Sequence, residues 1–530
     1  MPSWIVLLPP FFVILVALYT RHIIASFMAG IISCMFILYK GDVATGLSVV
    51  AARLWTNSGV GNVFSWHAFW SNTNILVFTF LICMGIIIVL LQKTGATRAF
   101  VHFAQHIVTG RRSAEMTSLL LSCIFFIDDY FSALTVGSIM RPIAQLYKIP
   151  AVKIAFLTTA MASPLAILSP LSSWIGEIIL QFGQIGISLN PQAFIVSDPY
   201  LVFVHTIPAI MYPILLIIGT WYIVIRGISY GPMALYEKNA LAAQSHQEKT
   251  SMSDIGSFVD FFLPLGSLIA GIIGVLLCTG NFFLFGGHAS FVEAIKIGSV
   301  PQALCAGGFI SLILSSIFFF SKKRITVQLF GTCFVSGFQL MFPSICMLTC
   351  AWTLGSFLKQ DLQTGSYIVF LFSSIITSTT LPALSFLCAS ITAWLIGSAW
   401  ATIGLMLPIV IEMLQQVSVI APHASADAVT LLFPVLGATL SGSVMGTHVS
   451  FISDTPIMSA ASIGADHVEH VKTMMWYILP IACATFFAYI AAGMLLHHCS
   501  VYLSLGVSLG IGILFSILFL EIGQRFFKHI

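Results

Sequence analysis

An uncharged apolar run occupies residues 73–92 and has the sequence TNILVFTFLICMGIIIVLLQ. About 20 apolar residues in a helix are enough to cross the hydrocarbon core of a bilayer. The same test selects further runs near residues 4–20, 23–39, 200–225, 259–280, 301–320, 472–497 and 501–523. We therefore expect an all-α polytopic membrane protein, with longer and less regular apolar regions at 114–190 and 326–464.

The composition of the chain also predicts lipid as its solvent. Of its 530 residues, 58% are hydrophobic and 7% are charged, whereas soluble domains have about 25% charged residues. The net charge of +3 is too small to indicate nucleic acid binding, and the 11 cysteines are scattered through apolar stretches. The sequence has no nucleotide-binding glycine loop, no Cys/His metal spacing and no hydrolase motif. We expect no nucleotide-driven pump, no enzyme and no cofactor.

The basic residues predict the orientation, because positively charged loops tend to stay in the cytoplasm. These residues lie at Arg21, 93–112, 141–153, 226–249, 322–324, Lys472 and 525–528. All of them are cytoplasmic if residues 116–143 enter and leave the membrane from that side and residues near 383–410 do so from the outside. The only extended hydrophilic stretch is interpreted as a cytoplasmic linker between two halves.

Three short segments recur in the same order in those halves. Leu91–Gly95 resembles Leu362–Gly365, Gly137–Ile143 resembles Gly404–Ile409, and Ser163–Pro170 resembles Thr447–Asp454. The orientation inferred from the charges gives the repeats opposite topology, which is a recurring plan of secondary transporters. In each repeat we expect one re-entrant hairpin and one discontinuous transmembrane helix. The hairpins are predicted at about 114–145 and 383–412, and the discontinuous helices at about 150–183 and 428–464.

The predicted organisation has six parts. They are N-terminal scaffold helices (1–72), inverted repeat 1 (73–225), the cytoplasmic linker (226–258), connecting transmembrane helices (259–325), inverted repeat 2 (326–497) and a C-terminal transmembrane helix (498–530). The first apolar run has no basic residue before it and no clear cleavage site after it, so we interpret it as a span rather than a signal peptide. The expected location is a bacterial cytoplasmic (inner) membrane.

Five acidic residues lie in apolar surroundings, namely Asp128, Asp129, Glu177, Glu412 and Asp454. A carboxylate at bilayer depth costs at least about 2.5 kcal/mol, so each is a candidate functional residue. Glu412, near a predicted helix end, is better explained by a structural role, and Glu177 fits either interpretation. The adjacent Asp128 and Asp129 repel each other, which favours a proton on one of them. Successive helical residues point about 100° apart, so one of the pair could face a site while the other caps a helix or pairs with a base.

A second polar stretch runs from Gly446 to Pro456, and its hydroxyl residues and proline disfavour an uninterrupted helix. The side chains that could coordinate a dehydrated alkali cation beside unwound carbonyls are Ser450, Ser453, Asp454 and Thr455. His448 titrates near physiological pH and is a second candidate, although a lone intramembrane histidine is as often a packing residue.

Hydroxyl residues also lie beside two tryptophans. Ser172 and Ser173 precede Trp174, and Ser398 and Thr402 flank Trp400. These small residues could line a site or could serve ordinary helix packing, and the two roles are compatible.

These motifs resemble those of the NhaC-type Na⁺/H⁺ antiporter family. The resemblance covers about residues 73–497 and is carried by Ile127–Ser138, Leu171–Trp174, Gly397–Trp400, Ser453–Ser459 and Ala465–Val471. It implies an ion transporter built on inverted repeats, an elevator-like movement and often a homodimer. The positions on which the family's sites fall are Asp128, Asp129, Ser172, Ser173, Ser398, Thr402, His448, Ser453, Asp454 and Thr455.

The chain departs from this family at two places. Where Gly-Asp-His is expected it has Gly446-Thr447-His448, and Val449-Ser450-Phe451 stands where Cys-Ser-Pro often follows. The loss of a carboxylate could remove a cation ligand, change the coupled charge or mark a different substrate.

The function expected from the sequence is the exchange of Na⁺ (or Li⁺) for H⁺, with Asp128, Asp129 and Asp454 as candidate cation ligands. The expected partners are membrane lipid, the small cation, the proton and a second copy of the chain, with no nucleic acid and no nucleotide. One alternative is a Na⁺- or H⁺-coupled transporter or exchanger of a small organic anion or amino acid. Another class of alternative is an ion channel or an intramembrane enzyme.

Overall fold

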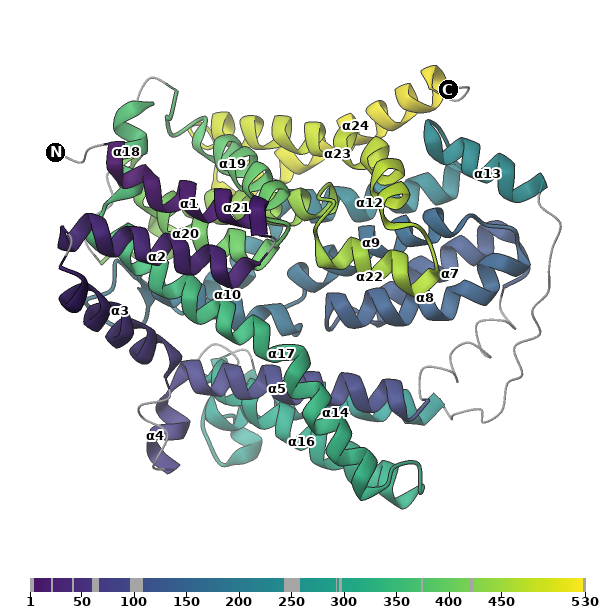
Figure 1. Ribbon diagram of the computed structural model, residues 1–530, viewed down its shortest axis with the longest axis horizontal. Coiled ribbons are helices and arrows are strands. Elements are labelled where there is room, and N and C mark those ends of the chain that lie inside the picture. Colours follow the sequence, from purple (N-terminus) through teal and green to yellow (C-terminus); the bar gives the residue numbers. More distant parts are fainter. Residues whose placement is uncertain are drawn as a thin grey trace.

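The computed structural model of the chain describes residues 4–20, 22–40, 42–59, 66–95, 108–242, 258–291, 293–294, 298–372, 375–418 and 423–527. Within them the fold is almost entirely helical (Figure 1). The elements in chain order are η1 (Trp4–Leu7), α1 (Leu8–Thr20), α2 (Ile23–Tyr39), α3 (Val43–Ser58), α4 (Trp66–Ser71), α5 (Thr73–Lys93), α7 (Arg111–Ile124), α8 (Asp129–Leu146), α9 (Ala151–Leu168), α10 (Ser173–Gln184), β1 (Ile187–Ser188), β2 (Ile195–Val196), α11 (Pro199–Thr206), η3 (Ile207–Ala209), α12 (Met211–Arg226), α13 (Pro232–Ala242), α14 (Phe258–Thr279), η4 (Phe283–Phe285), α16 (Val300–Ser321), α17 (Val327–Ser356), the π-helical turn η5 (Phe357–Asp361), α18 (Thr364–Leu371), α19 (Leu381–Ile396), α20 (Ala399–Val417), η6 (Ala426–Ala428), α21 (Leu432–His448), α22 (Asp454–Ile463), α23 (His467–Leu495) and α24 (Val501–Phe526). The short parallel pair β1–β2 is a small departure from the all-α expectation.

Eight helices in the described part of the chain are long and apolar enough to cross a membrane, and a ninth span results if one bent pair is counted as a unit. The run at 73–92 forms α5, which is capped by Asn72 and largely buried among other helices. The expected runs at 4–20 and 23–39 form shorter apolar helices. The basic residues Arg21 and Lys528, much of the segment 93–112 and linker residues 243–257 lie outside the described residues.

The apolar run expected near 200–225 is bent rather than straight. Its two parts, α11 with η3 and then α12, meet at Ile210 at an angle of 47°. Pro208 and Pro213 lie on the two sides of Ile210, and a proline lacks the N–H that a continuous helix needs. The hydroxyl of Tyr489 accepts an N–H from one side of the bend at 3.2 Å and donates to a carbonyl on the other at 2.7 Å. Tyr489 therefore supplies hydrogen bonds to backbone groups on both sides of the bend, as a membrane segment that water does not reach requires.

Helices stop and restart at all four places where hairpins or discontinuous helices were expected. The hairpin near 114–145 consists of α7 and α8 with a break at 125–128, and the hairpin near 383–412 consists of α19 and α20 with a break at 397–398. The discontinuous helices are α9 and α10, interrupted at 169–172, and α21 and α22, interrupted at 449–453. The opposite topology of the two repeats remains a prediction.

Local capping explains why the breaks occur at these residues. The side chain of Asp128 accepts a hydrogen bond from the backbone of Phe131 at 2.9 Å and begins α8. Ser398 begins α20 in the same way, and both are preferred residue types at a helix start. Gly397 ends α19 with φ of +77°, which glycine adopts most easily. A Cβ there would lie 2.6 Å from Ile452, so the break of α19–α20 is in close contact with the break of α21–α22.

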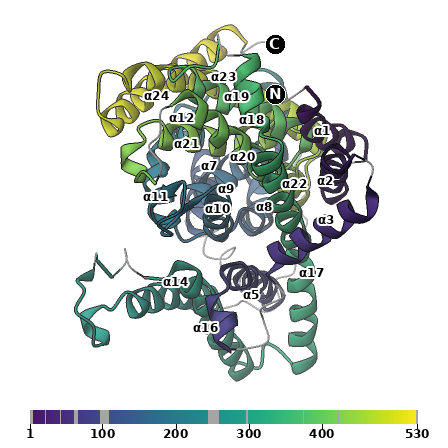
Figure 2. The same cartoon turned by 90° about the vertical axis from the view of Figure 1, so that its left-hand side faces the viewer.

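Packing brings the broken elements into one body. Helix α8 packs against α9 and α22, while α21 packs against both α19 and α20. Helices α5, α14 and α16 form a lobe beside this body, and α17 passes from the body into the lobe (Figures 1 and 2). Predicted repeat 1 contributes α5 to this arrangement and predicted repeat 2 contributes α17, so each repeat supplies its first helix.

Candidate cation-binding site

The first residues of α8, α10, α20 and α22 meet around one pocket. Its lining consists of Asp129, Tyr130, Ser163, Trp174, Gly397, Ser398, Ala399, Trp400, Thr447, Ser453, Asp454 and Thr455. All of these except Ser163 and Thr447 lie within two residues of the start of one of the four helices. A helix start carries unpaired N–H groups and a partial positive charge, which stabilises carboxylates placed beside it.

Asp129 is the buried carboxylate of the pocket. Its Oδ1 accepts a hydrogen bond from Trp174 Nε1 at 3.0 Å. Its Oδ2 accepts from the hydroxyls of Thr455 and Ser163, at 3.0 and 3.2 Å. The side chain is 3% exposed, so neutral donors from α9, α10 and α22 take the place of water around this carboxylate.

Asp128, the other member of the pair, points away from the pocket. Its Oδ1 caps α8 and its Oδ2 accepts from the hydroxyl of Ser173 at 2.8 Å. The backbone N–H of Ser173 in turn donates to the carbonyl of Ile127 at 2.8 Å. Asp128 and Ser173 thus fasten the tip of the first hairpin to the start of α10. One aspartate faces the pocket and the other caps a helix, which is one of the arrangements that the helical spacing allows.

Asp454 lies at the exposed end of the pocket, at the first residue of α22. The hydroxyl of Tyr130 donates to its Oδ2 at 3.4 Å. The neighbouring Ser453 is 2% exposed, lines the pocket and makes no side-chain capping bond to α22. Asp454 therefore lies at the exposed side of the pocket, and Asp129 lies further in.

Two tryptophans from different halves of the chain close the pocket on another side. The rings of Trp174, on α10, and Trp400, on α20, lie with their centroids 4.2 Å apart. Both side chains are at most 8% exposed. Because one ring also donates its N–H to Asp129, this wall joins the predicted repeats directly at the carboxylate.

The pocket is small and acidic. About 10 Å³ is open to the centre of a water-sized sphere, which is close to the minimum for one water molecule. None of the ion pairs in the described part of the chain includes Asp128, Asp129 or Asp454. That part also holds no group of three His, Cys, Asp or Glu side chains that could bind a metal. The polar lining therefore consists of carboxylate and hydroxyl oxygens with room for about one water-sized particle.

The remaining predicted site residues lie outside the pocket lining. The hydroxyl of Ser172 donates to the carbonyls of Ala166, in α9, and of Ser169, in the break. The hydroxyl of Thr402 donates to the carbonyl of Ser398. Ser450 accepts the N–H of Ile452 within the break. His448 is fully buried, and its Nδ1 lies 2.9 Å from the hydroxyl of Tyr212 on α12. Of the eleven predicted residues, Asp129, Ser398, Ser453, Asp454 and Thr455 line the pocket.

Several lining residues were not among the predicted ligands. Trp174 and Trp400 stood next to predicted hydroxyls, but their indoles were not assigned to the site. Ser163 was noted only as part of a repeated segment. Thr447, the residue at the departure from the family motif, lines the pocket, and its hydroxyl donates to the carbonyl of Val444 at 2.8 Å.

Glu412 has a structural environment, as its position suggested. It accepts hydrogen bonds from the backbone of Gly365 and the hydroxyl of Ser366, at the start of α18. It is absent from the pocket lining.

Comparison with known proteins agrees with this architecture. A model of the Na⁺/H⁺ antiporter family matches residues 165–494. The match includes α10 and α19–α22 but begins after Asp128 and Asp129. A protein of Haemophilus influenzae, described as uncharacterized, is 30% identical over 489 residues that cover 92% of this chain and 90% of the relative. The crystal structure of the YdaH transporter of Alcanivorax borkumensis, described as having an unusual topology, has a TM-score of 0.50 at 13% identity and covers 92% of this chain and 90% of that chain.

These helices, breaks and apolar spans define an integral, multi-pass membrane protein. By its sequence the chain belongs to the Na⁺/H⁺ antiporter family, which confirms the resemblance predicted from the motifs. The likeness to the YdaH transporter concerns the fold alone. The general function is cation/proton antiport.

Proposed function

We propose that this protein exchanges Na⁺, or Li⁺, for H⁺ across a bacterial cytoplasmic membrane, with Asp129 and Asp454 as the carboxylates of the cation site. The observation that carries the proposal is Asp129 itself. It is a buried carboxylate with three neutral hydrogen-bond donors, and no base pairs with it in the described part of the chain. A buried charge of this kind is costly unless a counter-ion or a proton neutralises it.

The hydroxyls around Asp129 suit an alkali cation. Ser163 and Thr455 direct their hydrogens toward the carboxylate, so the lone pairs of both oxygens remain available for an ion. Ser398 and Ser453 add two further oxygens to the lining. Hard oxygen ligands of this type can replace the water shell of Na⁺ or Li⁺ as the ion leaves solvent.

One observation favours a second candidate, the transport of a small organic anion. Four helix starts point at the pocket, and helix N-termini bind anions. However, Asp128 and Asp454 already lie at two of these starts, and a pocket of about one water is far below the several hundred Å³ typical of organic ligand sites. An organic anion would also need a positive charge nearby. Arg141 does not provide it, because this side chain lies against Gly464, at the opposite end of α22 from Asp454. The small cation therefore remains the better-supported substrate.

The experiment that tests the proposal is dissipation of a pH gradient in inverted membrane vesicles from a host without its own antiporters. We expect Na⁺ or Li⁺ to collapse the gradient with the natural protein and not with Asp454→Asn. The matched control is Asp42→Asn, because Asp42 caps α3 on the surface and asparagine caps a helix equally well. Normal exchange by Asp454→Asn would contradict the assignment of this residue. If no cation dissipates the pH gradient although the natural protein is folded, cation/proton antiport is rejected. Uptake of labelled organic acids is then the next measurement.

We further propose an elevator-like movement of the body past the lobe and α17. Glycine and alanine lie where helices of the body contact α5 of the lobe and α17. A Cβ on Gly176 of α10 would lie 2.9 Å from Val77 of α5, and one on Gly404 of α20 would lie 2.6 Å from Ala351 of α17. Close contacts between small residues let membrane helices pack without interlocking side chains.

Cross-linking tests this movement. A cysteine pair at positions 77 and 176, in a background lacking the native cysteines, should block exchange when joined and release it when reduced. Unaltered exchange by the joined protein would rule out sliding at this interface.

A further inference from the structure

Glu177 is a buried carboxyl group of α10 that the cation pocket does not use. It lies one helical turn beyond Ser173 and Trp174, the residues that bond Asp128 and Asp129. The side chain is 2% exposed, and its Oε2 is buried without a hydrogen-bond partner among the described residues. Buried polar atoms are almost always bonded, so an unpartnered carboxyl oxygen points to a ligand, a proton or water that the site receives in use.

A second unpartnered group continues the same face of α10. Gln181 follows Glu177 by four residues, which places both on one side of the helix. Its Nε2 is buried without a partner and faces Gly404 of α20, where a Cβ would lie 3.4 Å from it. The pair forms a polar face that leads from the start of α10 into the contact with α20, away from the pocket lining.

The charged groups one helical turn from Glu177 are acidic. Helix α10 packs against α5, α9, α11, α17, α20 and β1, and Glu177 belongs to none of the ion pairs in the described residues. The carboxylates of Asp128 and Asp129 are bonded one turn earlier on the same helix, by Ser173 and Trp174. Lys359 lies at the other end of α10, where it donates to the carbonyl of Ile185. A third negative charge there, with no base beside it, is strongly disfavoured at membrane depth. A proton on Glu177 removes that charge.

We propose that Glu177 is a proton-binding residue of the exchange. With no cation in the pocket, Asp129 and Glu177 hold one proton between them, and it lies on Glu177 because three hydrogen-bond donors stabilise the charge of Asp129 while Glu177 Oε2 has none among the described residues. When a cation binds and neutralises Asp129, Glu177 loses its proton to water along the face it shares with Gln181. One positive charge enters as one leaves, so the two sites compete through their charges without sharing an atom.

This inference rests on the proposed antiport, and proton release on cation binding tests it. Purified protein in detergent, in weak buffer with a pH-indicating dye, receives NaCl at a series of pH values, and Na⁺ binding is measured in parallel. For Glu177→Gln we expect Na⁺ still to bind, while proton release falls by about one proton per chain. Glu177→Asp, which keeps a carboxyl group, should restore the release with a displaced pH profile. The control is Glu412→Gln, a buried carboxyl group outside the pocket, which should release protons as the natural protein does.

The outcomes separate this inference from the function on which it rests. If the natural protein binds no Na⁺ or releases no protons, antiport itself fails and the inference fails with it. If Glu177→Gln releases as many protons as the natural protein over the same pH range, only the inference is overturned. Loss of Na⁺ binding by a Glu177→Gln protein of normal size-exclusion profile would also overturn it, because it would make Glu177 part of the cation site.

Discussion

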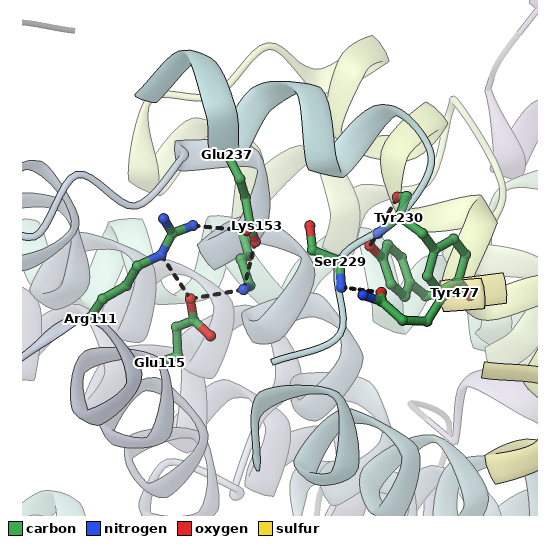
Figure 3. Close-up of polar contacts among 8 residues, drawn as sticks. Arg111, Glu115, Lys153, Ser229, Tyr230, Glu237 and Tyr477 are labelled. Carbon is green, nitrogen blue, oxygen red and sulfur yellow. Dashed lines mark hydrogen bonds and ion pairs between the residues drawn. The ribbon is translucent and has the colours of Figure 1, made fainter. Parts of the chain in front are cut away.

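Two groups of acidic side chains in the described part of the chain differ in what lies beside them. Near the base of α7, Glu115 and Glu237 share two bases (Figure 3). Lys153 Nζ lies 2.8 Å from Glu115 Oε1 and 2.7 Å from Glu237 Oε1, and Arg111 Nη2 lies 3.1 Å from Glu237 Oε2. Two acids and two bases from α7, α9 and α13 make a neutral group that holds these helices together.

At the pocket the acids have only neutral donors. Asp129 is bonded by an indole and two hydroxyls, and Asp128 by a hydroxyl and a backbone N–H. The two groups of acids therefore have different roles in our proposal. Where a fixed base neutralises the acid, the acid serves the fold. At the pocket no base neutralises Asp129, and we propose that a mobile cation or proton does so and that the site exchanges one for the other.

Asp129→Asn gives the most direct test of whether an acid without a base binds the cation. Loss of a charged ligand worth about 3 kcal/mol weakens cation binding roughly 100-fold. Thermal stability should stay the same or rise, because a buried charge is removed. The measurements are binding of radiolabelled Na⁺ and the melting temperature in detergent. Unchanged Na⁺ binding would show that Asp129 is no ligand.

The opposite outcome is expected of Lys153→Met. It leaves Glu115 and Glu237 with Arg111 alone, and breaking a buried ion pair costs about 3–5 kcal/mol. We expect a large fall in unfolding temperature but normal Na⁺ affinity in the folded fraction. Lys153→Arg, which keeps the charge, is the control and should lose less stability. Abolished binding without destabilisation would assign Lys153 to transport.

Thr447→Asp sharpens the comparison by adding a carboxylate where the family motif has one. Residue 447 lines the pocket and is 4% exposed, so a new negative charge there should raise cation affinity by about tenfold. It should also add a proton to the exchange at low pH. The checks are the Kd for Na⁺ and the ratio of protons released to Na⁺ bound. Thr447→Asn, which has the same shape without the charge, should not reproduce the gain.

The smallest effect is expected at a partly exposed ion pair. Arg53 on α3 contacts Asp361 of η5 at 2.7 and 3.2 Å, and both side chains remain partly exposed. Such pairs are worth at most about 1 kcal/mol. Asp361→Asn should therefore shift the melting temperature slightly and leave exchange unchanged. A loss of exchange in this variant would contradict the expectation and would show that the ion pair after the C-terminal end of α17 takes part in transport.

The sequence by itself determined the solvent, the class of protein and where the helices break. Apolar runs and the scarcity of charge require lipid, because a chain without polar surface cannot face water. The breaks follow from local chemistry, such as the caps Asp128 and Ser398 and the glycine at 397. These properties belong to neighbouring residues in the chain, so a sequence pattern can predict them. Family membership followed from the same motifs.

Only the tertiary structure decided which of the predicted groups act together. It turned Asp129 into the pocket and Asp128 onto a helix start, and it directed His448 to Tyr212. It paired Glu115 with Lys153, and it left Glu177 outside the ion pairs of the described residues. The reason is that the role of a buried carboxyl group depends on the charges and donors that packing brings to it. Those partners come from helices far apart in the chain, and no local pattern records them.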